Sequence, residues 1–75
     1  MNAAEFITAL AEFADKPVDA ITMADDLEAI GIDSNGVFEF LMNLETTLGI
    51  GQIEVSESVQ SVQDLHEAVL DAVDA

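Results

Sequence analysis

The stretch from Asp33 to Glu39 contains residue types that could support two kinds of chemistry. Asp33 and Glu39 offer carboxylate oxygens, and Gly36 lies between them as a glycine does in a calcium-binding loop. Ser34 offers a hydroxyl that could carry a covalently attached group. The remainder of the sequence decides between a metal ligand at Asp33 and a modified serine at Ser34.

The calcium interpretation fails at the two strongest positions of an EF-hand loop. Such a loop has a carboxylate first, a glycine sixth and a bidentate glutamate twelfth. If Gly36 is the sixth residue, the first is Gly31 and the twelfth is Met42, so both carboxylates are missing. The chain also contains no second candidate loop. We therefore expect no metal site.

A catalytic serine is another alternative, with Ser34 as nucleophile and His66 as general base. The sequence lacks the Gly-x-Ser-x-Gly context and a plausible oxyanion hole. A domain of 75 residues also buries only about 60% of its unfolded surface, which leaves little room for a cleft that excludes water. We expect no catalytic residue, and we expect His66 at the boundary of the core.

Acidic residues dominate the charge of the chain. Sixteen Asp and Glu residues and a single basic residue, Lys16, give a formal net charge of −15. Because this charge repels nucleic acids and anionic lipids, we expect neither as a partner, whereas basic protein surfaces would be attracted. The hydrophobic content of 51%, at helical spacing, favours a folded domain over a disordered acidic chain.

The sequence shows no sign of cross-linking or targeting. It has no Cys, so neither a disulfide nor a Cys-based metal site can stabilise the fold. No apolar run is long enough to span a bilayer, and the first residues, MNAAEFITAL, lack the basic start and long apolar stretch of a signal peptide. We expect a cytoplasmic monomer with one domain over residues 1–75 and no membrane insertion.

Apolar spacing predicts a first helix over residues 3–15, which ends before Pro17. A long connection over residues 15–33 follows, and a connection of this length in a small domain is more often functional than passive. The inner face of the helix is formed by Phe6, Ile7, Leu10, Phe13 and Ala14, and the connection is pinned by Val18, Ile21, Met23, Leu27, Ile30 and Ile32.

The second helix is predicted to begin at Ser34 and to stop at Gly49. Residues 54–58 can form at most a short helical turn, anchored by Ile53, Val55 and Val59, and the last helix opens at Ser61 with an acidic third position. The inner faces are Val37, Phe40, Leu41, Leu44 and Leu48 in the second helix, and Val62, Leu65, Val69, Leu70 and Val73 in the last. The fold class is thus all-α, a small three- to four-helix bundle with a long loop between helices one and two.

Three stretches together resemble the acyl carrier proteins. DDLEAIGIDS is similar to the acidic, leucine-bearing approach to the Gly-x-Asp-Ser attachment site of that family. FEFLMNLETTLGI is similar to the recognition helix that follows this site, and SVQDLHEAV to the closing helix. The resemblance covers nearly the whole chain.

This resemblance implies a role for each matching residue. Ser34, with Asp33 as its neighbour in the motif, would carry 4′-phosphopantetheine transferred from coenzyme A, and the terminal thiol of that arm holds acyl groups as thioesters. Glu39, Met42 and Glu45 would belong to the helix that docks on partners. The implied partners are a phosphopantetheinyl transferase and enzymes with basic docking patches that load, elongate or transfer acyl groups.

Asn35 departs from the family pattern, which usually has leucine directly after the serine. This change removes an apolar contact, and together with Gly36 it softens the first turn of the helix. We therefore count Asn35 among the residues that dock on partners, and we expect a carrier for specialised fatty-acid, polyketide or related biosynthesis rather than a housekeeping one. The alternative is an unmodified acidic helical adaptor that docks on basic partners.

Phe38 and Met42 do not fit the core face of the second helix. They lie about 40° and about 80° from the direction of Ser34, on the same side of the helix as Glu45. They could pack against the connection or the short turn, or they could form an apolar docking surface ringed by acid.

The start of the second helix suits an attached phosphate, because unpaired backbone N–H groups and the helix dipole favour an anion there. Ser34 or Asp33 could instead simply cap the helix. The two roles are compatible if Asp33 caps and Ser34 carries the group.

Overall fold

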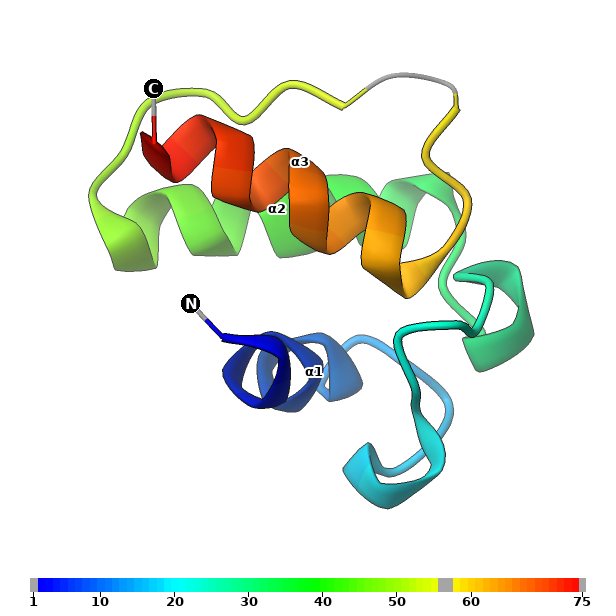
Figure 1. The fold of residues 1–75 in the computed structure, drawn as a ribbon. Coiled ribbons are helices and arrows are strands. Elements are labelled where there is room, and N and C mark those ends of the chain that lie inside the picture. Colours follow the sequence, from blue (N-terminus) through cyan, green and yellow to red (C-terminus); the bar gives the residue numbers. More distant parts are fainter. Residues whose placement is uncertain (1, 56–57, 75) are drawn as a thin grey trace.

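The computed structural model describes residues 2–55 and 58–74 and shows a small bundle of helices. Within these residues the chain forms three α-helices, α1 (Ala3–Ala11), α2 (Ser34–Leu48) and α3 (Val62–Asp74). Two single turns of 3-10 helix, η1 (Val18–Ala20) and η2 (Glu28–Ile30), lie in the connection between α1 and α2. In Figure 1, α3 lies in front of α2, and α1 lies below both. The expected small all-α bundle is confirmed.

Helix α1 begins with a capping box and ends earlier than its apolar pattern predicts. The Asn2 side chain accepts a hydrogen bond from the Glu5 N–H, and the Glu5 carboxylate accepts one from the Asn2 N–H. The prediction that this helix continues to Asp15 is wrong, since α1 stops at Ala11. The Asp15 N–H donates to the Ile30 carbonyl at 2.8 Å, so the chain has already left the helix to meet the connection.

The end of α2 and the beginning of α3 lie where the sequence predicts. Gly49 follows α2 with a left-handed φ of 66°, and its N–H donates to the Glu45 carbonyl. At the start of α3, the Ser61 hydroxyl accepts a hydrogen bond from the Asp64 N–H at 3.1 Å. The Asp64 carboxylate in turn accepts the N–H groups of Gln60 and Ser61, each at 3.2 Å. Because these donors stabilise the ionised carboxylate, they lower the pKa of Asp64.

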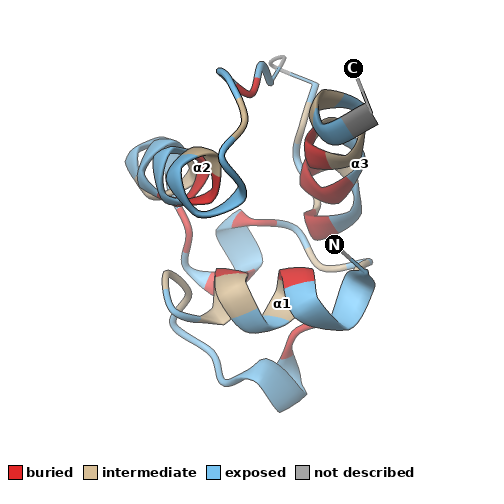
Figure 2. Cartoon of the chain, turned by 90° about the vertical axis from the view of Figure 1, so that its left-hand side faces the viewer, coloured by how far each residue is buried: buried red, intermediate tan, exposed pale blue. Residues whose placement is uncertain are grey.

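The core lies where the three α-helices and the first connection face one another, as the buried residues in Figure 2 show. The rings of Phe6 and Phe40 meet edge to face with their centroids 5.4 Å apart, and Phe6 also packs against His66 at 4.8 Å. His66 is therefore buried and not at the boundary of the core as expected. The predicted inner faces are buried or half-buried except for Leu48 and Val73, which are exposed near the ends of their helices. The core consists of Phe6, Leu10, Ile21, Leu27, Ile30, Ile32, Phe40, Leu41, Leu44, Ile53, Val62, Leu65 and Val69.

The connection before α2 is held against the bundle by its apolar side chains. Ile21, Leu27, Ile30 and Ile32 are buried as predicted, whereas Val18 is exposed. These side chains fix the path of the chain toward the start of α2.

Gly31 lets the connection turn toward α2. Its φ of 83° lies in the left-handed region, and a Cβ at this position would collide with the Asp15 side chain. Together with the hydrogen bond between Asp15 and Ile30, this close approach ties the segment that follows α1 to the residues that precede Ser34.

Backbone hydrogen bonds also join the connection to the start of α3. The Leu27 N–H donates to the Gln60 carbonyl and the Val62 N–H donates to the Asp25 carbonyl, each at 2.9 Å, around an isolated antiparallel bridge. We call these two paired segments the backbone clip. It joins the connection before α2 to the start of α3.

The predicted short turn over residues 54–58 forms no helix at residues 54 and 55, and residues 56 and 57 lie outside the described part of the chain. Of the three expected anchors, Ile53 is buried and Val59 is half-buried, but Val55 is exposed. In the described residues the bundle therefore has three α-helices and no fourth.

Candidate functional site

Ser34 is the first residue of α2, and its side chain is exposed. Asp33 caps the helix, because its Oδ1 accepts a hydrogen bond from the Gly36 N–H at 2.8 Å. The hydroxyl of Ser34 makes no hydrogen bond to any described residue. Since the neighbouring aspartate already provides the cap, the serine oxygen is available for another role.

The first turn of α2 also offers unpaired backbone donors. The first intrahelical bond runs from the Val37 N–H to the Asp33 carbonyl at 3.0 Å. The N–H groups of Ser34 and Asn35 have no partner among the described residues. Such groups, together with the positive end of the helix dipole, stabilise an anion. A phosphate ester on the serine would lie beside them.

A groove with a volume of about 720 Å³ lies beside Ser34. This volume is within the range of small-molecule sites, about 300–1,000 Å³. The groove is bounded by η2 and the residues before it, by one face of α2 and by the segment that leads to α3. Its apolar lining is formed by Leu27, Ile32, Val37, Phe38, Leu41, Val55 and Val59, and its polar lining by Asp26, Glu28, Asp33, Ser34 and Gln60. An apolar chain linked to the serine could therefore be shielded from water close to its point of attachment.

The sequence did not indicate this groove, because one of its walls comes from the segment that leads to α3, which is distant in the chain from the walls formed by residues 26–41. Val37 and Leu41 were predicted as core residues, and Val59 as an anchor of the segment before α3. The apolar spacing of each segment was visible, but spacing alone does not show which of these faces leave a space between them.

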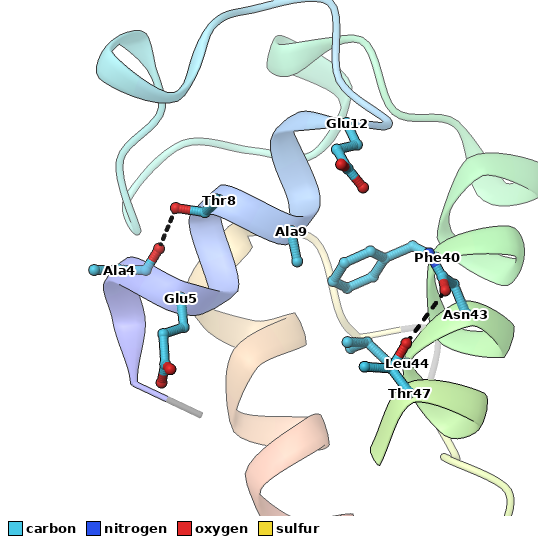
Figure 3. Close-up of a pocket in the computed structure, with 9 residues that line it drawn as sticks. All are labelled: Ala4, Glu5, Thr8, Ala9, Glu12, Phe40, Asn43, Leu44 and Thr47. Carbon is cyan, nitrogen blue, oxygen red and sulfur yellow. Dashed lines mark hydrogen bonds between the residues drawn. The ribbon is translucent and has the colours of Figure 1, made fainter. Parts of the chain in front are cut away.

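A second hollow, with a volume of about 510 Å³, lies between α1 and α2 (Figure 3). The Phe40 ring points from α2 toward Ala9 of α1, and Glu5 and Glu12 lie along the rim. Ser34 does not line this hollow. The groove beside Ser34 is therefore the one of these two spaces that an attached group can reach directly.

Four of the residues predicted to dock on partners are exposed on α2: Asn35, Phe38, Glu39 and Met42. The exposed fractions of Phe38 and Met42 are 69% and 59%, so neither side chain packs into the core. Large apolar side chains with this exposure, next to a carboxylate, are suited to a partner with an apolar centre and a basic rim.

Glu45 differs from the other residues predicted to dock. It is half-buried, and its Oε2 accepts a hydrogen bond from the Ile53 N–H at 3.1 Å. This bond joins the last turn of α2 to the segment that follows it. No pattern in the sequence indicated this contact, because it depends on how the chain returns after Gly49.

The alternative interpretations of the serine and the aspartate find no structural support. His66 packs against Phe6 and does not line the groove that contains Ser34. In residues 2–55 and 58–74, no three His, Asp or Glu side chains gather as a metal site would require, and Asp33 is engaged as a helix cap. None of the helices in this part of the chain has the length and apolar character needed to cross a membrane.

Comparison with protein families agrees with the geometry of the site. A family model described as a phosphopantetheine attachment site matches residues 4–69, which run from the first turn of α1 into α3. No curated protein and no solved structure matches the chain. Members of the matched family carry 4′-phosphopantetheine covalently, are generally not catalysts, and interact with a phosphopantetheinyl transferase and with biosynthetic enzymes. The chain belongs to this family of phosphopantetheine carriers.

Proposed function

We propose that this protein is an acyl carrier in which Ser34 is the attachment residue. It would deliver acyl intermediates between enzymes of fatty-acid, polyketide or related specialised biosynthesis. The observation that carries the proposal is the exposed Ser34 hydroxyl, free of hydrogen bonds to the described residues, at the start of α2 and beside an apolar groove.

The residues around Ser34 fit a group that is attached through a phosphodiester. The Asp33 carboxylate accepts a hydrogen bond from the Gly36 N–H, so this negatively charged group is engaged in capping the helix. The free N–H groups of the first turn supply partial positive charge near the serine oxygen. When attached, the arm supplies a terminal thiol that holds acyl groups as thioesters.

Partners would recognise the exposed face of α2. Phe38 and Met42 supply apolar area, and Glu39 supplies negative charge on the same helix. With a net charge of −15, the protein would be drawn toward basic docking patches on the transferase and on acyl-handling enzymes. Asn35, one residue from the attachment serine, would distinguish the cognate enzymes from general fatty-acid enzymes.

The attachment is tested by incubating the protein with coenzyme A and a broad-specificity phosphopantetheinyl transferase. We expect the intact mass to increase by one arm. Ser34→Ala should block the increase, whereas Ser61→Ala, which changes another serine at the start of a helix, should still accept the arm. Both variants and the wild type are to be compared under conditions in which circular dichroism shows them folded.

The competing function is an unmodified acidic adaptor that docks on a basic partner. It would be supported if the mass of the wild type stays unchanged while the same transferase modifies a known carrier. Modification of Ser34→Ala to the same extent as the wild type would place the attachment on another residue.

A further inference from the structure

The dipeptide Asn35-Gly36, next to Ser34, has a reactivity that the carrier role does not use. The side-chain amide of an asparagine can be attacked by the backbone nitrogen of the next residue, and glycine hinders this attack least because it has no Cβ. The chain has three asparagines, and only Asn35 precedes a glycine, since Asn2 and Asn43 precede larger residues.

We propose that Asn35 is a site of spontaneous deamidation and that the Asp33 cap sets its rate. In the first step the backbone nitrogen of Gly36 loses its proton and bonds to Cγ of Asn35. The bond between Cγ and Nδ2 breaks, and the side-chain nitrogen leaves as ammonia with that proton. In the second step water adds to either carbonyl carbon of the resulting five-membered imide and opens it to aspartate or isoaspartate. One amide and one water thus become one carboxyl group and one ammonia, and no other reactant is needed.

In the folded protein two features oppose the first step. The Gly36 N–H is donated to Oδ1 of Asp33 at 2.8 Å, and the negative charge of this acceptor disfavours loss of the proton. The helical backbone angles of α2 also hold the Gly36 nitrogen away from Cγ of Asn35. The reaction therefore requires the first turn of the helix to open.

This first turn is the weak end of α2. Gly36 has low helix propensity, and it lies one residue before Val37, the first backbone donor within the helix, so the Gly36 N–H bonds to the Asp33 side chain instead. The Asn35 side chain is exposed, so no packing has to be broken before it reacts. Asn43 lies in the interior of α2, where its Oδ1 accepts a hydrogen bond from the Thr47 hydroxyl at 3.4 Å. It serves as an internal reference.

The product would affect the neighbouring serine. Aspartate adds a negative charge one residue from Ser34, and isoaspartate adds a carbon to the backbone between residues 35 and 36. Isoaspartate would move the Gly36 N–H out of reach of the Asp33 side chain, so the first turn of α2 would stay open. If Ser34 is the attachment residue as proposed above, the deamidated chain accepts its arm more slowly than the intact chain.

The test follows deamidation in the full chain before any arm is attached, by peptide mapping that separates asparagine, aspartate and isoaspartate. In urea, we expect Asn35 to convert faster than Asn43, and Gly36→Ala to suppress conversion at Asn35. In native buffer, Asn35 should convert more slowly than in urea. Asp33→Ala should raise the native rate about fivefold, as loss of a helix cap shifts a local opening equilibrium.

Two matched variants separate local opening from general destabilisation. Asp33→Asn keeps a capping oxygen and should stay closer to the wild-type rate than Asp33→Ala. Ser61→Ala removes the cap of α3 and should leave the rate at Asn35 unchanged. Equal conversion of Asn35 and Asn43 in urea would overturn the proposed reaction. Equal acceleration by Ser61→Ala and Asp33→Ala would overturn the control by the cap.

The effect on attachment is measured separately, with purified deamidated and intact chains and the transferase. Slower modification of the deamidated chain supports the link to Ser34, and equal rates refute that link. If neither chain is modified, the proposed carrier function fails, while the deamidation result stands on its own measurement.

Discussion

Phe38 and Phe40 lie two positions apart on α2 and have opposite environments. Phe38 is 69% exposed and lines the groove beside Ser34, whereas Phe40 is 1% exposed and contacts the rings of Phe6 and Phe13 at 5.4 and 5.6 Å. The same residue type, phenylalanine, therefore has two different roles on one helix. Phe40 stabilises the fold, and Phe38 is available to a partner or to an attached chain.

This contrast gives a prediction for a pair of variants. Phe40→Ala should lower the free energy of unfolding by about 3–5 kcal/mol, because it leaves a cavity in the core. Phe38→Ala should change it by no more than about 0.5 kcal/mol, as for most surface substitutions, while weakening binding to partner enzymes. Urea unfolding measures the free energy of unfolding. The rate of modification by the transferase measures the effect on binding to a partner enzyme. An equal loss of stability in both variants would contradict the proposed role of Phe38.

The resemblance implied that Ser34 carries the attached group, but the residues alone could not show which of Ser34 and Asp33 caps α2, because both residue types cap helices well. The assignment depends on a register of one residue, and the structure shows that Asp33 lies before the first turn and Ser34 within it. The docking role predicted for Glu45 was implied by the family resemblance. Its bond to the Ile53 N–H depends on tertiary structure and could not be predicted from helical spacing.

At the scale of elements, α3 begins with two reciprocal hydrogen bonds between Ser61 and Asp64, and a third from the Gln60 N–H. The backbone N–H groups of Gln60 and Ser61 lower the pKa of Asp64 below its ordinary value of 3.8. A carboxyl group whose pKa is lower in the folded state stabilises the fold when it is ionised. The contribution of Asp64 is therefore fully present above the pKa of the unfolded chain and is lost as the pH falls through the lower folded pKa.

Comparison of the wild type with Asp64→Asn tests this pH dependence. Asparagine has the shape of a protonated aspartate, so the stability difference between the two proteins should be constant at neutral pH and shrink as the pH falls below 3.8. Taking the difference removes the effects of the other carboxylates, which are the same in both. The measurement is urea unfolding at a series of pH values. A difference that does not change with pH would show that the charge of Asp64 does not stabilise α3.

Helix ends that depend on local chemistry could be predicted, and those that depend on tertiary contacts could not. The Ser61 hydroxyl can cap a helix start and Gly49 can adopt the left-handed φ of a helix end, and α3 and α2 begin and end at these residues. The end of α1 was predicted too late, because the apolar pattern continues through Phe13 while the Asp15 N–H bonds to the Ile30 carbonyl. That bond joins residues whose proximity the sequence does not reveal.

At the scale of the whole molecule, charge and size act against each other. A net charge of −15 is confined to a chain with a radius of gyration of 11.1 Å, close to the Debye length of about 10 Å at 0.1 M salt. In the described residues, Lys16 forms no salt bridge that would offset part of the repulsion. Much of the repulsion therefore acts across distances that added salt can screen.

We expect the melting temperature to rise between low salt and about 0.1 M sodium chloride, because screening relieves repulsion in the compact state more than in the expanded one. A variant with Glu12→Gln and Glu67→Gln, at two exposed positions, should show a smaller rise. Thermal unfolding followed by circular dichroism measures both. A melting temperature that is independent of salt would refute this account, and a single saturable response to calcium would point back to metal binding at Asp33.

Because of the backbone clip, the positions of the helices do not depend on the side chains that shape the groove. Its hydrogen bonds join main-chain atoms, which every residue type except proline can supply on the donor side. Side chains beside it, such as Val59, can therefore be exchanged for larger or smaller ones while the connection and the start of α3 stay joined. Under the carrier function proposed above, the groove could thus be adapted to cargo of different sizes by changing a few side chains, without rebuilding the bundle around Ser34.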